Sequence, residues 1–253
     1  MSLLRIARNV SDLARLASFY CALGFQQREP PRQNTALAAL LGVERVTSLH
    51  LVSGGQSLEL TACEPAGRPY PAEAPANARL FQHIALLTPD IAAAAARALA
   101  AGAVPVSRGG PVRLPPASGG VTAWKFRDPD GHPLEYLERA AGEGYDHSAI
   151  AAADVAASTR FYTALGLAPR HRQRNSGPEQ ERLDGVPGAA ATIVSLRGAM
   201  GPGVELLGYD RIIATPPPAA NDIAADRLVI AAGAAGLRRD PDGHLILLAP
   251  ERG

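Results

Sequence analysis

Hydrophobic and polar positions alternate in short blocks along the chain, which is the period of a β-strand. The first block, residues 4–7, precedes a segment that Ser11 or Asp12 can cap as a helix and that Gly24 can end. The apolar residues of this segment recur at helical spacing: Leu13, Leu16, Ala17, Tyr20 and Leu23. The pattern predicts a strand followed by a helix.

Three further strands follow this helix. A polar loop separates the first from the second, and a Gly-Gly turn joins the second to the third. Their predicted ranges are 25–28, 45–52 and 57–63. The unit therefore has the order βαβββ.

The same unit recurs along the chain. Arg5, Asp12, Phe19, Tyr20 and Gly24 are matched 142 positions later by His147, Asp154, Phe161, Tyr162 and Gly166. Another copy begins at 82–86 and contains a predicted helix to Ala101. A fourth copy is shortened. Its first strand is predicted at 227–232, and 13 positions separate Arg227 from Asp240, against 45 from His83 to Asp128. The missing 32 residues are enough for a helix and the strand after it.

The second and fourth copies end in an Asp-Pro-Asp-Gly sequence, at 128–131 and 240–243. Proline, glycine and aspartate each favour a tight turn between two apolar runs, so we expect two β-hairpins. The aspartates are interpreted as turn formers. His132 and His244, which follow the glycines, are interpreted as exposed turn residues.

Segments rich in proline, alanine and glycine, at 64–78 and 209–225, connect the copies. The join at 140–144 is the shortest. We therefore predict two domains, 1–140 and 145–253, each built from two consecutive copies. The polar segment 170–188 is expected to form a flap over a binding site.

Two glutamates stand out from these patterns. Glu135 shares a strand face with core positions, and Glu59 alternates with Leu58 and Leu60. A carboxylate among core side chains costs several kcal/mol unless a partner compensates it. Both are therefore candidate site residues.

Composition narrows the possible functions. The chain has 253 residues and a net charge of +1, without a basic stripe, which argues against nucleic acid as a partner. Cys21 and Cys63 lack metal-type spacing. The alanine-rich run at 91–101 is too short to span a membrane, and no secretory signal is visible. A cytoplasmic protein without membrane contacts is expected.

Four βαβββ copies, a strand opening His-Ile-Ala-Leu, helices ending Phe-Tyr-x-x-Leu-Gly, and Phe-x-Asp-Pro-Asp-Gly-His-Pro-Leu-Glu together resemble the vicinal oxygen chelate superfamily. This superfamily includes glyoxalases, bleomycin-resistance proteins and extradiol dioxygenases. The resemblance implies an α+β fold of βαβββ modules, paired into two cup-shaped mixed β-sheets. The fourth module would be truncated and lack its helix. It also implies a divalent metal held by the first and last strands of each module.

The resemblance assigns four positions to each predicted half. Those of the first half are Arg5, Glu59, His83 and Glu135, and those of the second are His147, Glu205, Arg227 and Leu247. Glu59, His83 and Glu135 are then the expected ligands of Zn, Mn, Fe, Ni or Co. Neither half contains the two histidines and one glutamate of extradiol dioxygenases, so that reaction is the less favoured.

Other residues are candidates for substrate binding. Arg5 cannot ligate a metal, but it can clamp a substrate anion or pair with a glutamate in place of a metal. Trp124 can line the first cup or pack in the core. His147 and Glu205 can bind an organic ligand in the second cup, with Asn175, Glu179 or Gln180 from the flap.

Two functions remain open. One is a metal-dependent lyase or isomerase of the glyoxalase type, acting on a small molecule with adjacent oxygens, with Glu135 or Glu59 as general base. The alternative is a metal-free small-molecule-binding protein like the bleomycin-resistance members. Because one chain supplies all the modules, a monomer is expected, with a homodimer possible.

Overall fold

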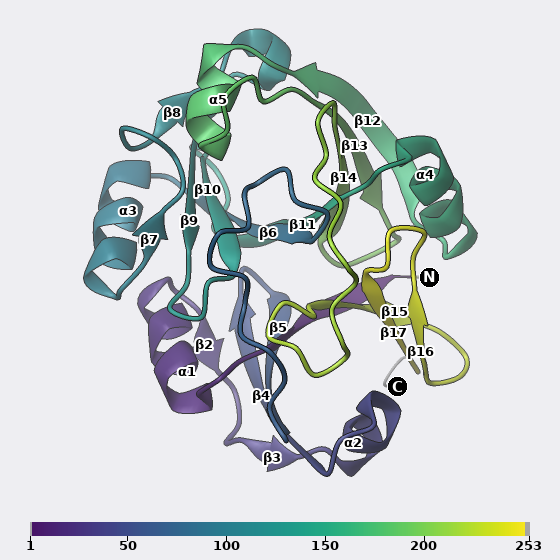
Figure 1. Ribbon diagram of the computed structural model, residues 1–253. Coiled ribbons are helices and arrows are strands. Elements are labelled where there is room, and N and C mark those ends of the chain that lie inside the picture. Colours follow the sequence, from purple (N-terminus) through teal and green to yellow (C-terminus); the bar gives the residue numbers. More distant parts are fainter. Residues whose placement is uncertain (1, 251–253) are drawn as a thin grey trace.

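The computed structural model describes residues 2–250 and contains two mixed β-sheets with helices packed around them (Figure 1). Within that range no helix is long and apolar enough to cross a membrane. In chain order the elements are β1 (Leu3–Asn9), α1 (Leu13–Ala22), β2 (Gln26–Gln27), β3 (Arg32–Gln33), α2 (Thr35–Leu41), β4 (Arg45–Ser53), β5 (Gln56–Glu64), β6 (Phe81–Thr88), α3 (Ile91–Ala100), β7 (Val104–Pro105), β8 (Val112–Arg113), the 3-10 turn η1 (Pro116–Ser118), β9 (Thr122–Arg127), β10 (Pro133–Glu138), β11 (Gly144–Ala151), α4 (Val155–Ala164), β12 (Ala168–Asn175), α5 (Pro178–Asp184), β13 (Ala191–Arg197), β14 (Gly203–Tyr209), β15 (Arg227–Ala231), β16 (Gly236–Arg239) and β17 (Leu245–Ala249).

Each sheet joins two repeats through their first strands. The terminal sheet has the order β16-β17-β15-β1-β5-β4-β2, with β3 also paired to β4. The central sheet has the order β12-β13-β14-β11-β6-β10-β9-β7, with β8 also paired to β9. In both, the first strands of two repeats run antiparallel, β1 beside β15 and β6 beside β11. The expected α+β fold of βαβββ modules in two mixed sheets is confirmed.

The repeats do not pair in chain order, so the expected pairing of consecutive copies is wrong. The first repeat pairs with the last and the second with the third, and each sheet therefore spans the boundary expected at 140–144. Strands β10 and β11 lie on opposite sides of β6, so they are separated from each other by about twice the 4.8 Å spacing between neighbouring strands. Residues 139–143 reach about 17 Å when extended, so this join can hold the second and third repeats in one sheet.

Three helices begin alike because an aspartate caps each one. The side chains of Asp12, Asp90 and Asp154 accept hydrogen bonds from the third backbone N–H beyond them, at 2.9–3.0 Å. Such caps satisfy amides that have no partner inside the helix. The caps fix where α1, α3 and α4 leave their sheets.

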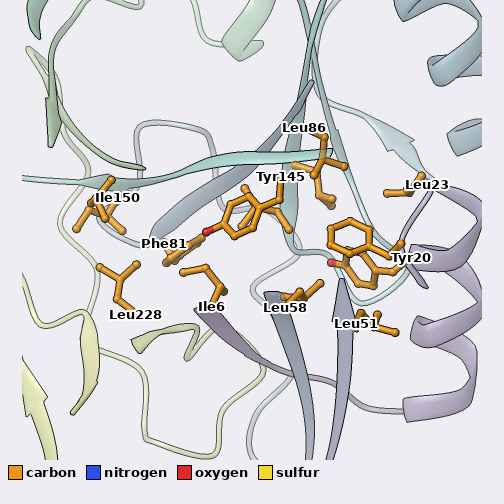
Figure 2. Close-up of a cluster of buried hydrophobic side chains, with 14 of the residues drawn as sticks. Ile6, Tyr20, Leu23, Leu51, Leu58, Phe81, Leu86, Tyr145, Ile150 and Leu228 are labelled. Atoms are coloured by element: carbon orange, nitrogen blue, oxygen red, sulfur yellow. The ribbon is translucent and has the colours of Figure 1, made fainter. Parts of the chain in front are cut away.

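The sheets pack back to back around the main hydrophobic core. Figure 2 shows Ile6 and Leu58 of the terminal sheet facing Phe81 and Tyr145 of the central sheet, and all four are buried.

Side chains alternate across a regular strand, so Glu59 beside Leu58 and His83 beside the core residue Ile84 point to the outer faces, which form the terminal cup and the central cup. The β6–β11 register shifts between Tyr145 and His147, and His147 lines the central cup although Tyr145 lies in the core. This alternation decides which polar residues can form a site.

Two short helices lie where the sequence predicts loops. Asn34 caps α2, whose apolar side chains pack into the terminal cup against β15 and β17. Pro178 opens α5 at the first helical position. Helix α5 lies over the central cup, against β8 and β9 (Figure 1).

Both Asp-Pro-Asp-Gly turns dock onto a helix of another repeat. Tyr20 Oη donates to Asp128 Oδ2 at 2.8 Å, and Tyr162 Oη donates to Asp240 Oδ2 at 2.9 Å. The hairpins thus fasten α1 and α4 to neighbouring repeats. The aspartates form the turns as expected and also make these tertiary contacts.

The expectation that His132 and His244 are exposed is wrong. His132 is fully buried, with its Nδ1 donating to Asp128 Oδ2 and its Nε2 to the carbonyl oxygen of Ile223, both at 2.9 Å. His244 is also buried, and its Nε2 donates to the carbonyl oxygen of Ala151 at 2.7 Å. Each ring anchors its hairpin to a more distant segment.

The His132 contacts predict an alkaline loss of stability. Burial opposes its charge, but Asp128 outweighs burial and raises the pKa of His132. A raised folded-state pKa stabilises the protein below the unfolded value of about 6.5, and this stabilisation is lost as pH rises through the folded pKa. The free energy of unfolding of wild type, measured with urea, should therefore fall above pH 6.5, and His132 should contribute up to about 1.4 kcal/mol per pH unit to this fall. In His132→Gln the slope should be smaller by this contribution. An equal slope in both proteins would contradict the assignment, and His171→Gln on the exposed β12 is the matched control.

Candidate metal centre

Two histidines and two glutamates meet at the floor of the central cup. His83 and His147 lie on the adjacent first strands β6 and β11, and Glu135 and Glu205 lie on β10 and β14, which flank them. In the register, Glu135 is opposite Ala85, two residues after His83, and Glu205 is opposite Ala149, two after His147. The same relation in both repeats brings the four side chains to one place.

The distances show how closely they converge. His83, Glu135 and His147 each offer a ligand atom, and these atoms all lie within 4.8 Å of one another. His83 Nε2 is 3.2 Å from Glu135 Oε2, and His147 Nε2 is 3.5 Å from Glu205 Oε2. The group therefore consists of two His–Glu pairs, one from each repeat.

Hydrogen bonds to neighbouring residues hold the second pair in place. His147 Nδ1 donates to Asp146 Oδ2 at 2.8 Å, which aims Nε2 at the centre. Arg197 in turn donates to Asp146 Oδ1 at 3.2 Å, and Ser195 Oγ donates to Glu205 Oε1 at 2.6 Å. A carboxylate on the far nitrogen is the usual way to orient a metal-binding histidine.

The charges of the site follow from burial and from these partners. Burial lowers the pKa of His83, which favours the neutral imidazole. Burial opposes the charge of Glu135, but His83 and Lys125 outweigh it and lower the pKa of Glu135 to about 2. For His147, Glu205 and Asp146 overcome burial and raise the pKa to about 9. Glu135 is therefore a carboxylate at neutral pH.

Unpartnered nitrogen atoms show that this donor set fits a metal. Both ring nitrogens of His83 and Nε2 of His147 are buried without a hydrogen-bond partner in the described structure. Such orphaned buried atoms are costly. Imidazole nitrogen and carboxylate oxygen are ligands that Zn and other divalent transition metals accept. The residues present therefore fit the metal that the sequence predicts.

The site opens into a cavity of about 270 Å³. Its floor carries the four residues, and its walls include Lys125 from β9, Asn175 from β12 and Gln180 from α5. The segment predicted as a flap thus forms part of the wall. Asn175 and Gln180 contribute to the lining, and Glu179 does not.

The structure separates the three predicted metal ligands. His83 and Glu135 lie together in the central cup, but Glu59 lies on β5 of the terminal sheet. The reason is the pairing of the repeats, which brings His147 and Glu205 beside His83 in place of Glu59. Trp124 does not reach the cavity, because it stacks in the core on Phe126, 4.6 Å between ring centroids.

In the terminal cup an ion pair occupies the positions that hold the candidate metal ligands in the central cup. Arg5 and Glu59 occupy positions equivalent to His83 and Glu135, and Arg5 Nε donates to Glu59 Oε2 at 2.7 Å. Arg227 is buried and donates to Asn9 Oδ1 and to a threonine hydroxyl. The fourth position is Leu247. Of the two roles expected for Arg5, the structure shows the pairing with a glutamate.

Sequence reasoning missed several residues of the central cup. Lys125 lies directly opposite Glu135 on β9, and its Nζ donates to Asp184 Oδ1 at 2.6 Å. The signal for Lys125 was the one that identified Glu135, a charged residue within a strand of core positions. Asp184 and Tyr209 carried no such signal, because they become neighbours only through the fold.

The expectation about extradiol dioxygenases also changes. It rested on the absence of two histidines and one glutamate from either half of the chain. Across the halves, His83, His147 and Glu135 form such a set. Glu205 adds a second carboxylate, 3.5 Å from His147 Nε2.

Comparisons with known proteins agree with the fold. The profile of the Glyoxalase/Bleomycin resistance protein/Dioxygenase superfamily matches residues 2–136, more than half of the chain. Glyoxalase I from Zea mays superimposes with a TM-score of 0.69 at 18% identity, covering 98% of this chain and 92% of that one. A putative dioxygenase from Bacillus subtilis superimposes with a TM-score of 0.62 at 12% identity, covering 100% and 86%. Comparison with curated protein sequences finds no match. At such low identities the solved structures show the fold alone.

Proposed function

The chain belongs to the Glyoxalase/Bleomycin resistance protein/Dioxygenase superfamily, and we propose that it is a metal-dependent lyase or isomerase of the glyoxalase type. The observation that carries this proposal is the convergence of His83, Glu135 and His147 at the floor of a cavity, with Glu205 beside them. The substrate would be a small molecule with adjacent oxygens. The site lies within one chain, which is consistent with a monomer.

His83 and His147 would hold a divalent ion through Nε2, and Glu135 and Glu205 through their carboxylates. Zn, Mn, Fe, Ni and Co all suit this donor set. When bound, the ion supplies Lewis-acid polarisation of substrate oxygens. This ligand set replaces the expected one, in which Glu59 stood third.

The two glutamates have a second task in this proposal. A carboxylate in reach of a substrate C–H can take its proton as a general base and return it to the neighbouring atom. Glu135 and Glu205 extend from strands on opposite flanks of the two histidines, so one carboxylate can face each side of a bound molecule. His83 and Lys125 lower the pKa of Glu135, so its carboxylate is ionised at neutral pH, the form that a general base needs.

Two other functions have an observation in their favour. The set His83, His147 and Glu135 matches the two-histidine, one-carboxylate arrangement of non-heme Fe(II) oxygenases. A metal-free binding role is favoured by the raised pKa of His147, about 9. The protonated imidazole can balance the charge of Glu205 without a metal. The second carboxylate, Glu205, favours proton transfer over oxygen chemistry.

Proton exchange tests the proposal directly. The protein is loaded in turn with each of the five metals and incubated with hydroxyacetone in D₂O, and loss of the α-hydrogen signal is followed by NMR. We expect metal-dependent exchange, reduced at least about 100-fold in Glu135→Gln or Glu205→Gln, because general-base catalysis contributes 10²–10⁴-fold.

Each alternative has its own result. Oxygen consumption with catechol by the Fe(II) form, without exchange by any form, would favour a dioxygenase. Protein that takes up none of the five metals would leave the metal-free binding role. Either result would contradict the glyoxalase-type proposal.

A further inference from the structure

One carboxylate organises the cavity wall that faces the candidate metal centre. Asp184, 1% exposed, accepts hydrogen bonds from Lys125 Nζ at 2.6 Å, Gln180 Nε2 at 2.7 Å and Tyr209 Oη at 3.1 Å. All three donors line the cavity together with His83 and the other candidate ligands. Their positions are therefore fixed by a residue at the end of α5 that does not itself line the cavity.

The orientation of the Gln180 amide follows from this contact. A carboxylate only accepts hydrogen bonds, so the atom facing Asp184 must be the NH₂ group. The carbonyl Oε1 then has no partner in the described structure, although Gln180 is only 4% exposed. Leaving such an acceptor buried without a partner is costly, so a ligand that donates a hydrogen bond to Oε1 would be favoured in the cavity.

Lys125 offers the complementary group. Its ammonium has three N–H donors, of which the bond to Asp184 uses one. The side chain lies opposite Glu135 in the register, so it stands between the candidate metal centre and α5. The wall therefore presents an acceptor and donors that share one anchor, Asp184.

We propose that this wall recognises a carboxamide on the substrate, with the amide N–H donating to Gln180 Oε1 and the amide oxygen accepting from Lys125 Nζ. This inference rests on the proposed function, because it places the carboxamide on the same molecule whose adjacent oxygens bind the metal. A carboxylate fits less well. It has no donor for Gln180 Oε1, and the charge of Lys125 is already balanced by Asp184.

A set of chelating probes separates these contacts. The protein is loaded with Co²⁺, and its visible spectrum is titrated with the hydroxamates of succinamic, levulinic and succinic acid. These carry the same metal-chelating group and end in a carboxamide, a methyl ketone and a carboxylate. The corresponding probes with one more methylene are titrated as well, so that reach does not decide the outcome.

In wild type the carboxamide probe should bind about fivefold more tightly than the ketone, the worth of one net hydrogen bond, and more tightly than the carboxylate. In Gln180→Met the ratio of carboxamide to ketone affinity should fall to about one. Glu179→Met, the neighbouring residue outside the cavity lining, is the matched control and should keep the wild-type ratio.

The failures are distinguishable. Equal binding of carboxamide and ketone by wild type at both chain lengths, with clear spectral changes, would overturn the carboxamide inference and leave the metal site standing. This reading needs no variant, so it holds even if Gln180→Met is unstable. Absence of any spectral change with every probe would overturn the chelation proposal itself.

Discussion

Replacing His83 with alanine should leave the purified protein without a bound divalent metal. His83 is a buried imidazole whose two ring nitrogens make no hydrogen bond in the described structure, and burial lowers its pKa, which favours the neutral form. Loss of a residue that merely orients a ligand weakens metal binding 10–100-fold, so loss of a ligand should exceed about 100-fold. Elemental analysis and a metal titration followed by calorimetry would measure the change.

The control for this variant distinguishes the two cups. Glu59→Gln alters the terminal sheet, so the metal content per folded molecule should equal that of wild type. Circular dichroism of His83→Ala should show an intact fold, since no strand pairing depends on its side chain. Metal retained by His83→Ala, or lost from Glu59→Gln, would contradict the assignment of the site to the central cup.

Replacing Arg5 with methionine should lower the free energy of unfolding by about 3–5 kcal/mol. Glu59 is 1% exposed in its side chain, and Arg5 Nε is its hydrogen-bond donor at 2.7 Å. Without Arg5 the buried carboxylate would lose its closest cation and keep only the weaker attraction of His50, 4.0 Å away. Urea unfolding followed by circular dichroism measures the loss.

Two companion measurements test the cause. The double variant Arg5→Met/Glu59→Leu should recover most of the loss, because a buried ion pair can often be replaced by apolar groups of similar size. Burial opposes the charge of Glu59, but Arg5 and His50 lower its pKa. The contribution of the pair is therefore present above about pH 4.3 and lost as pH falls through the folded pKa. A deficit in Arg5→Met that stays constant from pH 7 to pH 3 would show that the charge of Glu59 is not its cause.

The periodicity of the sequence predicted most of the secondary structure. The repeat at 142 residues matched Arg5 with His147. In three of the repeats the glutamate lies in the same register, opposite the second residue after the first-strand site position, although the number of residues between the two positions differs. Helix α2 was missed because its apolar residues follow a polar loop and pack onto a distant sheet. Helix α5 was missed because six of its seven residues are polar or proline.

The pairing of the repeats decided the composition of the site, and the sequence left it open. Each candidate position was identified, but the grouping of Glu59 with His83 assumed that consecutive repeats share a sheet. The join at 139–143 permits the second and third repeats to share a sheet, but no local sequence pattern specifies which repeats pair. For the same reason the contact of Lys125 with Asp184, 59 residues later, carried no local signal.

The pairing of the first repeat with the last also implies an order of assembly during synthesis. Strands β1 and β5 emerge early, but β15, the antiparallel neighbour of β1, begins only at Arg227. At 5–20 residues per second the interval from residue 64 to residue 227 lasts about 8–33 s. Within that time the whole central sheet, complete at Tyr209, leaves the ribosome.

The candidate metal centre can therefore form while one edge of β1 still has no partner. An open edge with apolar side chains is a template for pairing between chains. Nascent chains would be most vulnerable to aggregation in this interval, and slower translation of residues 210–226 would lengthen the exposure of β1 without affecting the central cup.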